Sequence, residues 1–306
     1  ARETADGERR TPLVPETAKK FAALGAKLRL ESNASLESHF LDSDYADTEI
    51  KASLAETYAG ADVILRVTPP SDEEIAALPD GSVLIGLLKP YSSKERLAAL
   101  NAKKITAFAL ELLPRISRAQ SMDVLSSQAN LAGYKAVMIA ADKYQRIFPM
   151  LMTAAGTVKA ARVVVLGAGV AGLQAIATAK RLGAVVEASD VRPAAKEQIE
   201  SLGAKFIDVP YETAEEKEAA EGVGGYARPM PPSWLARQKV EVAKRVAQAD
   251  VVISTALIPG RAAPVLITED MVKSMKPGSV IIDMAAGKGA PNPDGTVGGN
   301  CPLTEA

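Results

Sequence analysis

A glycine-rich turn between an apolar strand and a helix is the feature that most limits how this sequence folds. Residues 163–166 are apolar, and Gly167, Gly169 and Gly172 follow them in the spacing G-x-G-x-x-G. A second apolar run ends in Asp190, 18 residues after Gly172. This order is typical of the βαβ unit that binds a dinucleotide. The alternative is a glycine-rich turn in an α/β domain that holds no nucleotide.

Each residue of this unit has a physical task in a dinucleotide site. Gly167 allows the tight turn, Gly169 lets the backbone approach a pyrophosphate, and Gly172 lets helix and strand pack closely. The N–H groups that open the helix, including those of Val170 and Ala171, then face the phosphates.

The acid that ends the second apolar run sets the predicted coenzyme. Asp190 accepts hydrogen bonds from ribose hydroxyls and repels a 2′-phosphate, which favours NAD(H) over NADP(H). Arg192 keeps a second interpretation open, because an arginine at this place can bind a 2′-phosphate. With Asp190 present, we expect NAD(H).

Length and composition bound the class of protein. The 306 residues are enough for two domains, and 47% apolar with 24% charged residues is usual for a globular protein. A net charge of −1 without a basic block gives no sign of nucleic-acid binding. The single cysteine, Cys301, excludes an internal disulfide and a cysteine-cluster metal site. No apolar stretch is long enough for a direct membrane span.

Strand and helix patterns alternate along the chain, which predicts an α/β protein of two doubly wound Rossmann-like domains with mostly parallel sheets. A long helix over residues 123–148 is expected to join them. The expected domains are an N-terminal domain over 1–122, a dinucleotide-binding domain over 123–300, and a truncated return towards the first domain over 301–306. The expected strands are 27–31, 62–67, 83–88 and 105–110 in the first domain and 162–166, 185–189, 205–209, 251–255 and 280–283 in the second.

Two loops carry further candidate site residues. Residues 114–123 place two arginines, a glutamine and an aspartate in the link between the domains, where the cleft of a two-domain nucleotide protein lies. Asp123, Ser126 and Ser127 also suit a helix cap with an ion-pair network. Residues 255–260 end a strand of the same sheet and are expected to border the crevice at its carboxyl edge. The alternative is a strand followed by a turn that the proline stops, without a role in binding.

Two irregular segments and the only histidine have weaker signals. Residues 210–232 are long for a loop and are interpreted either as a lid or as a surface excursion. Residues 287–300 are rich in glycine, proline, asparagine and aspartate and are not expected to form regular structure. His39 lies away from every expected strand end, so we expect a surface role for it.

Several of these segments together resemble the NAD(H)-binding component of the proton-translocating nicotinamide nucleotide transhydrogenases. The resemblance covers nearly the whole chain, and the stretch RISRAQSMD at residues 115–123 is its most specific portion. The other matching stretches are residues 126–134, 152–158, 167–175, 255–260 and 275–283.

The resemblance implies roles for individual residues. Arg115, Gln120, Asp123 and Ser126 are expected to surround the nicotinamide as the catalytic group, and Tyr226 to close over the bound nucleotide. The full expected NAD(H)-binding set is Arg115, Ile116, Ser117, Arg118, Gln120, Asp123, Ser126, Gly167, Gly169, Val170, Ala171, Gly172, Asp190, Val191, Arg192, Gly225, Tyr226, Gln238, Thr255, Ala256 and Leu257.

The resemblance also implies a reaction and partners. Hydride passes directly between NAD(H) on this protein and NADP(H) on a partner component, and a membrane-spanning component couples that step to proton translocation. We expect a homodimer that is cytoplasmic and peripheral on the inner face of the cell membrane through this complex. Neither a metal nor a nucleic acid is expected.

Alanine dehydrogenases share the two-domain form and give the alternative function, an NAD-dependent oxidation of an amino acid. They use a lysine and a histidine, and the aligned positions of this sequence hold Thr68 and Lys89, although Arg10 is retained. The loss of both groups argues against amino-acid oxidation. A third interpretation is an NAD-binding module without enzyme activity.

The sequence as given departs from the family at three places. The family's first strand and its C-terminal return are not in it, and residues 287–297 resemble an insertion. The sheet of the first domain is therefore expected to be open.

Overall fold

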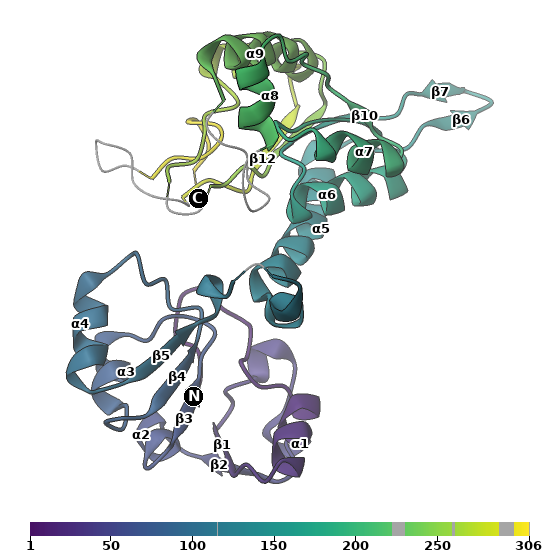
Figure 1. Cartoon of the computed structure of the whole chain (residues 1–306). Coiled ribbons are helices and arrows are strands. Elements are labelled where there is room, and N and C mark those ends of the chain that lie inside the picture. Colours follow the sequence, from purple (N-terminus) through teal and green to yellow (C-terminus); the bar gives the residue numbers. More distant parts are fainter. Residues whose placement is uncertain (115, 222–229, 259–260, 288–296, 306) are drawn as a thin grey trace. The chain divides into compact units, whose positions relative to one another are not determined.

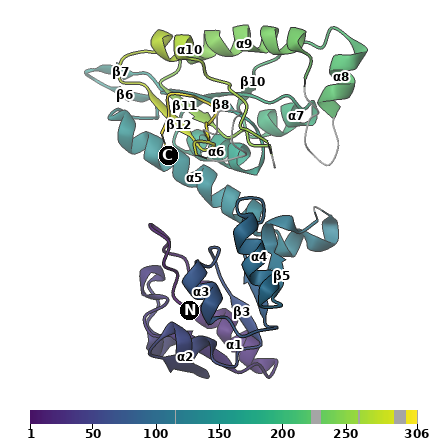
Figure 2. The same ribbon diagram turned by 90° about the vertical axis from the view of Figure 1, so that its left-hand side faces the viewer.

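The computed structural model describes every residue except 115, 222–229, 259–260, 288–296 and 306 (Figures 1 and 2). It divides into two units, Ala1–Leu125 (unit 1) and Ser126–Ala306 (unit 2), and each is described by itself. The predicted α/β class is confirmed, because helices alternate with strands and every described strand pair except one hairpin is parallel.

Unit 2 is built on a five-stranded parallel sheet in the order β10-β9-β8-β11-β12. The chain runs outward from β8 in one direction and then returns to start again at β11, so the order reverses between these two central strands. This is the doubly wound order, in which ligands bind at the carboxyl ends of the strands where the order reverses, here β8 and β11. The strands are β8 (Arg162–Leu166), β9 (Val185–Ser189), β10 (Lys205–Phe206), β11 (Val251–Ser254) and β12 (Val280–Asp283).

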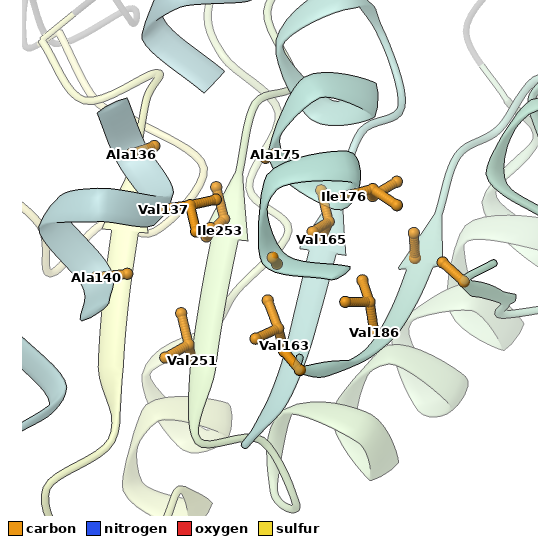
Figure 3. Packing of buried hydrophobic residues seen from close by; sticks show 14 of the residues in the cluster. Ala136, Val137, Ala140, Val163, Val165, Ala175, Ile176, Val186, Val251 and Ile253 are labelled. Carbon is orange, nitrogen blue, oxygen red and sulfur yellow. The ribbon is translucent and has the colours of Figure 1, made fainter. Parts of the chain in front are cut away.

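Helices cover both faces of this sheet because its strands are apolar on both sides. Alternate residues of β8 enter different clusters, with Val163 and Val165 in one and Val164 and Leu166 in the other. The first cluster holds residues of α5, α6 and α7, and the second holds residues of α9 and α10. Figure 3 shows α5 and α6 side chains packed against Val163, Val165, Val251 and Ile253. The helices are α5 (Val124–Tyr144), α6 (Val170–Arg181), α7 (Ala194–Ser201), α8 (Ala214–Glu221), α9 (Pro232–Val246) and α10 (Glu269–Ser274).

Unit 1 contains two smaller parallel sheets, one of β1 and β2 and one in the order β3-β4-β5. Its described strands therefore follow chain order. The strands are β1 (Leu28–Glu31), β2 (Thr48–Lys51), β3 (Val63–Leu65), β4 (Val83–Gly86) and β5 (Thr106–Ala109). The helices are α1 (Pro15–Ala23), α2 (Leu54–Tyr58), α3 (Asp72–Ala77) and α4 (Lys94–Ala102), with short 3-10 helices η1 (Leu36–Ser38), η2 (Asp42–Asp44), η3 (Leu110–Leu112) and η4 (Ser117–Met122).

Capping residues mark a helix start in unit 1, whereas short exposed strands have no such local signal. Ser71 accepts a hydrogen bond from the Glu74 N–H in a capping box at the start of α3. The strand β2 and the hairpin of β6 (Leu151–Thr153) and β7 (Gly156–Val158) were not predicted. All six strand residues of the hairpin are exposed, so they carry no core pattern that marks them in the sequence. Within the described residues, no helix has the length and apolar character needed to cross a bilayer.

A buried carboxylate fastens the edge of the unit 2 sheet that lies opposite the crevice. Asp250, directly before β11, accepts hydrogen bonds from the Arg162 N–H and from Lys276 Nζ, each at 2.8 Å. Burial by itself raises the pKa of the Asp250 carboxyl, but these hydrogen bonds outweigh that effect and hold the pKa below its usual value. Ionised Asp250 therefore ties together the starts of β8, β11 and β12.

We predict that Asp250→Asn destabilises the protein by about 2 kcal/mol at neutral pH, since it removes a charge-assisted bond. A lowered folded-state pKa contributes stability above the unfolded-state pKa, and that contribution disappears as pH falls through the folded-state value. Urea unfolding at decreasing pH should therefore show the two proteins converge in acid. Asp208→Asn, in an exposed ion pair with Lys196, is the control and should change little. An Asp250→Asn deficit that persists in strong acid would contradict this account.

Candidate dinucleotide-binding site

The glycine turn after β8 has the geometry that each glycine requires. Gly167 has φ +95°, a left-handed conformation in which a side chain is strained. A Cβ on Gly172 would lie 1.8 Å from the Gly167 carbonyl oxygen, so α6 packs onto the turn at a distance that excludes any side chain. At Gly169, in contrast, φ is −71° and a Cβ would meet nothing within 4 Å.

The open space at Gly169 fits the pyrophosphate of a dinucleotide. Neither backbone strain nor a neighbouring atom of the described protein demands glycine here. The N-terminal turn of α6 begins at this residue, and the first N–H groups of a helix, here those of Val170 and Ala171, have no partner within the helix. A backbone without a side chain at the positive end of a helix is a site where a phosphate can approach closely.

Hydrogen bonds tie the turn to the strand on each side. The Gly167 N–H donates to the Ser189 carbonyl at the end of β9 at 2.8 Å. The Thr255 hydroxyl, directly after β11, donates to the Gly167 carbonyl at 2.9 Å. The carboxyl ends of β9, β8 and β11 therefore form one rigid edge.

Asp190 caps the turn from the β9 side. Its carboxylate accepts hydrogen bonds from the N–H groups of Ala168 at 2.7 Å and of Arg192 at 2.8 Å. The guanidinium of Arg192 donates to both carboxylate oxygens at 2.9 Å. Arg192, which the sequence left open as a phosphate ligand, is thus the counter-ion of Asp190. A ribose hydroxyl that bonds to Asp190 competes with this guanidinium.

Val191, which follows Asp190 in the predicted coenzyme-binding set, is held by aromatic side chains that were not among the predicted site residues. The Val191 carbonyl accepts a hydrogen bond from the Tyr211 hydroxyl at 2.9 Å. Tyr211 stacks on the buried Trp234 with ring centroids 6.0 Å apart. Gln238, also on α9, is buried with Nε2 3.5 Å from the Ser189 hydroxyl. It lies under the end of β9, where it supports the strand.

The N-terminal half of α5 reaches the same turn. A Cβ on Gly133 would lie 2.2 Å from the Ala171 carbonyl oxygen, so α5 and α6 cross in backbone contact at that point. Asn130 donates to Gln174 at 3.3 Å beside this crossing. Ser126 lies seven residues before Gly133 on α5, which is about 10 Å along a helix.

The remaining predicted residues lie either in unit 1 or in the stretches of chain that the structure does not describe. Ile116, Ser117, Arg118, Gln120 and Asp123 lie in unit 1, on and beside η4, and the first four are exposed. Within unit 2, the described glycine, aspartate and threonine residues of the predicted set lie together at the carboxyl ends of β8, β9 and β11. The residues outside the description are Arg115, Gly225 and Tyr226.

The strand ends of unit 1 are occupied by the chain's own carboxylates. Glu3 accepts hydrogen bonds from the N–H groups of Val67 and Thr68, at 2.7 and 3.1 Å, and from the Thr68 hydroxyl. Glu111 accepts from the N–H groups of Leu88 and Lys89. These pairs of N–H groups at the carboxyl ends of β3 and β4 would otherwise suit a small anion.

Two more residues with candidate roles lie in unit 1. Arg10 forms a salt bridge of 2.6 Å with Glu8. His39 is exposed at the end of η1, in agreement with its predicted surface role. The described residues contain no cluster of three His, Cys, Asp or Glu side chains that would hold a metal ion.

Comparison with known proteins identifies the family of the chain. The families described as "Alanine dehydrogenase/PNT", N-terminal and C-terminal domain, match residues 1–132 and 136–302. The chain is 49% identical to an NAD(P) transhydrogenase subunit alpha protein of Rhodospirillum rubrum, over 99% of this chain and 78% of that protein. It is 28% identical to alanine dehydrogenase of Methanococcus maripaludis, over 94% and 71%.

A solved structure agrees with these matches. The transhydrogenase of Sinorhizobium meliloti superposes with a TM-score of 0.84 and 47% identity, covering 100% of this chain and 80% of that chain. The resemblance inferred from the sequence motifs is therefore confirmed.

We predict that Gly169→Ala leaves stability nearly unchanged but lowers NADH affinity about tenfold or more, since a methyl group would occupy the open space that we predict for the pyrophosphate. Gly172→Ala is the contrast, because its methyl group meets the Gly167 carbonyl and should destabilise the fold by about 1–3 kcal/mol. Thermal unfolding and NADH titration of both variants separate the two roles. NADH binding by Gly169→Ala at the wild-type affinity would remove this residue from the site.

Proposed function

The chain belongs to the alanine dehydrogenase/PNT family, and from this membership we propose that it is the NAD(H)-binding component of a proton-translocating NAD(P) transhydrogenase. The observation that carries the proposal is the identity with transhydrogenase α subunits, which extends over the whole chain and far exceeds that with alanine dehydrogenases. The glycine turn, with Asp190 at the end of the next strand, supports NAD(H) as the coenzyme.

The alternative, an alanine-type dehydrogenase, is less well supported by unit 1. The positions aligned with that enzyme's lysine and histidine are Thr68 and Lys89. The Thr68 hydroxyl and N–H are bonded to Glu3, and the Lys89 N–H is bonded to Glu111. A substrate carboxylate would have to displace these internal carboxylates, which makes an amino-acid site at these strand ends unfavourable.

The residues that we assign to the site hold and orient the coenzyme and move no proton. NADH supplies a hydride, which passes to NADP⁺ held on the partner component. Gly169 and the first turn of α6 bind the phosphates, and Asp190 binds the ribose. Arg115, Gln120, Asp123 and Ser126 orient the nicotinamide, and Tyr226 covers the nucleotide. Such a step needs two rings held at contact distance more than it needs an acid or a base.

The partners and the location follow from the same proposal. An NADP(H)-binding component receives the hydride, and a membrane-spanning component couples the transfer to proton translocation. The chain then lies on the cytoplasmic side, peripheral to the inner face of the cell membrane. We retain 1–122 and 123–300 as its two functional domains, with 301–306 as the start of a return to the first.

We further propose that two copies associate through the hairpin β6–β7 and α5. The hairpin extends away from the rest of unit 2 (Figure 1) and presents Met150, Leu151, Met152 and Val158 to solvent. Leu131 and Tyr134 expose further apolar surface on α5. A projecting apolar arm and an exposed apolar helix face are each typical of a contact with another polypeptide.

The dimer is tested by Met152→Asp, since Met152 is 73% exposed and contributes little to the core. The buried charge should convert the dimer to monomers in analytical ultracentrifugation while thermal stability changes little. Val240→Asp on α9, also an exposed apolar residue of unit 2, is the control and should leave the dimer intact. A Met152→Asp protein that is still dimeric would exclude the hairpin from the contact.

The enzymatic proposal is tested by mixing the chain with the NADP(H)-binding component. Hydride exchange between NADH and an NADP⁺ analogue, followed by absorbance, is expected only when both proteins are present. NADH formation from NAD⁺ and alanine without the partner would establish the dehydrogenase instead. Tight NADH binding with neither activity would indicate a binding module.

A further inference from the structure

Asn300 is a fully buried polar residue in the irregular stretch that neither the coenzyme nor the core explains. Its Oδ1 accepts a hydrogen bond from the Ala256 N–H at 3.0 Å, and its Nδ2 donates to the Ala256 carbonyl at 2.8 Å. Nδ2 also donates to the Pro264 carbonyl at 2.8 Å. One side-chain amide thus satisfies both backbone groups of Ala256, as a neighbouring strand would.

The residue that makes these bonds is itself held firmly. The Asn300 carbonyl accepts from the N–H groups of Leu266 and Ile267 at 2.8 and 2.9 Å. The next N–H, of Cys301, donates to the Asp283 carboxylate at 2.9 Å. On the other side, a Cβ on Gly299 would lie 2.3 Å from Asp283 Oδ2, so only glycine fits before Asn300. Asn300 is therefore a fixed point between the ends of β11 and β12.

The sheet order shows which half of a bound dinucleotide lies near Ala256. Asp190 follows β9, the glycine turn follows β8, and Thr255 and Ala256 follow β11. A dinucleotide with its adenosine ribose at Asp190 and its pyrophosphate at the glycine turn therefore extends its nicotinamide half over the loop after β11.

We propose that Asn300 is a positioning residue for the nicotinamide half of the coenzyme, acting through the loop of Thr255, Ala256 and Leu257. This inference rests on the proposed function. Within the described residues, Asn300 makes no direct bond to Gly167 or Asp190. Its bonds to Ala256 hold the loop against the segment that contains Asn300. The Thr255 hydroxyl holds the same loop against the glycine turn through the Gly167 carbonyl.

Asparagine is specified here by hydrogen-bond chemistry. The site needs an oxygen that accepts from the Ala256 N–H and an NH2 group that donates to the carbonyls of Ala256 and Pro264. An amide on a side chain of this length supplies both. Aspartate has the same shape but would place an oxygen against the carbonyls of Ala256 and Pro264. Serine supplies a single hydroxyl that is too short to serve both backbone groups of Ala256.

The test compares Asn300→Asp and Asn300→Ser with the wild-type chain, and each is assayed with the NADP(H)-binding component. ADP-ribose, which contains the adenosine and pyrophosphate but no nicotinamide, is the probe for the other half of the site. Thr304→Ala is the matched control. Its hydroxyl bonds to Asp283 and the Cys301 carbonyl on the same return segment, away from Ala256.

Both Asn300 variants should lower the hydride-transfer rate about tenfold or more, because a displaced loop misplaces the reacting ring. Their ADP-ribose dissociation constant should stay within about twofold of wild type, as should every parameter of Thr304→Ala. If Asn300→Asp does not fold, Asn300→Ser gives the same comparison. Amide hydrogen exchange at Ala256 should accelerate in a folded variant.

Two results would overturn the proposal. One is a folded Asn300 variant that transfers hydride at the wild-type rate. The other is an equal loss of ADP-ribose and NADH affinity, which would make Asn300 a general support of the fold. Failure of the wild-type chain to bind NADH or to exchange hydride would refute the proposed function itself, and the wild-type measurement shows that separately.

Discussion

Backbone-to-backbone contact at the glycine turn is the constraint on which unit 2 depends. Helix α6 rests so closely on the Gly167 carbonyl that a methyl group on Gly172 has no room, and α5 meets α6 in the same way at Gly133. The Thr255 hydroxyl bonds to that same carbonyl and joins β11 to the turn. These contacts fix the carboxyl edge of the sheet and leave the first N–H groups of α6 facing outward. The candidate binding site is a product of close packing.

The two units treat the carboxyl ends of their strands differently. In unit 1, Glu3 and Glu111 accept hydrogen bonds from the N–H pairs that follow β3 and β4. In unit 2, the corresponding place after β8 is a glycine turn with open space at Gly169. Asp190 accepts from the Ala168 N–H of that turn, but within the described part of the chain no atom fills the space at Gly169, and this agrees with a protein that binds a dinucleotide on unit 2.

The sequence predicted elements well where burial leaves a periodic pattern. The strands β8, β9 and β12 begin and end at the predicted residues. In β8, for example, four consecutive buried apolar residues lie between an arginine and a glycine, which mark its two ends in the sequence. Strand β2 and the hairpin β6–β7 were missed, since their side chains are largely exposed and short exposed strands carry no such pattern. The predicted helix over 123–148 ends at Tyr144.

By itself the sequence determined the nucleotide unit, because G-x-G-x-x-G and a following acid are local requirements of turn geometry and ribose binding. Only the tertiary structure decided the partners of the polar side chains. Arg192 turned out to be the counter-ion of Asp190, and Asn300 the residue that holds Ala256 across 44 positions of chain. A local pattern encodes a turn, whereas a buried amide finds its partner only when distant strands meet in the folded sheet.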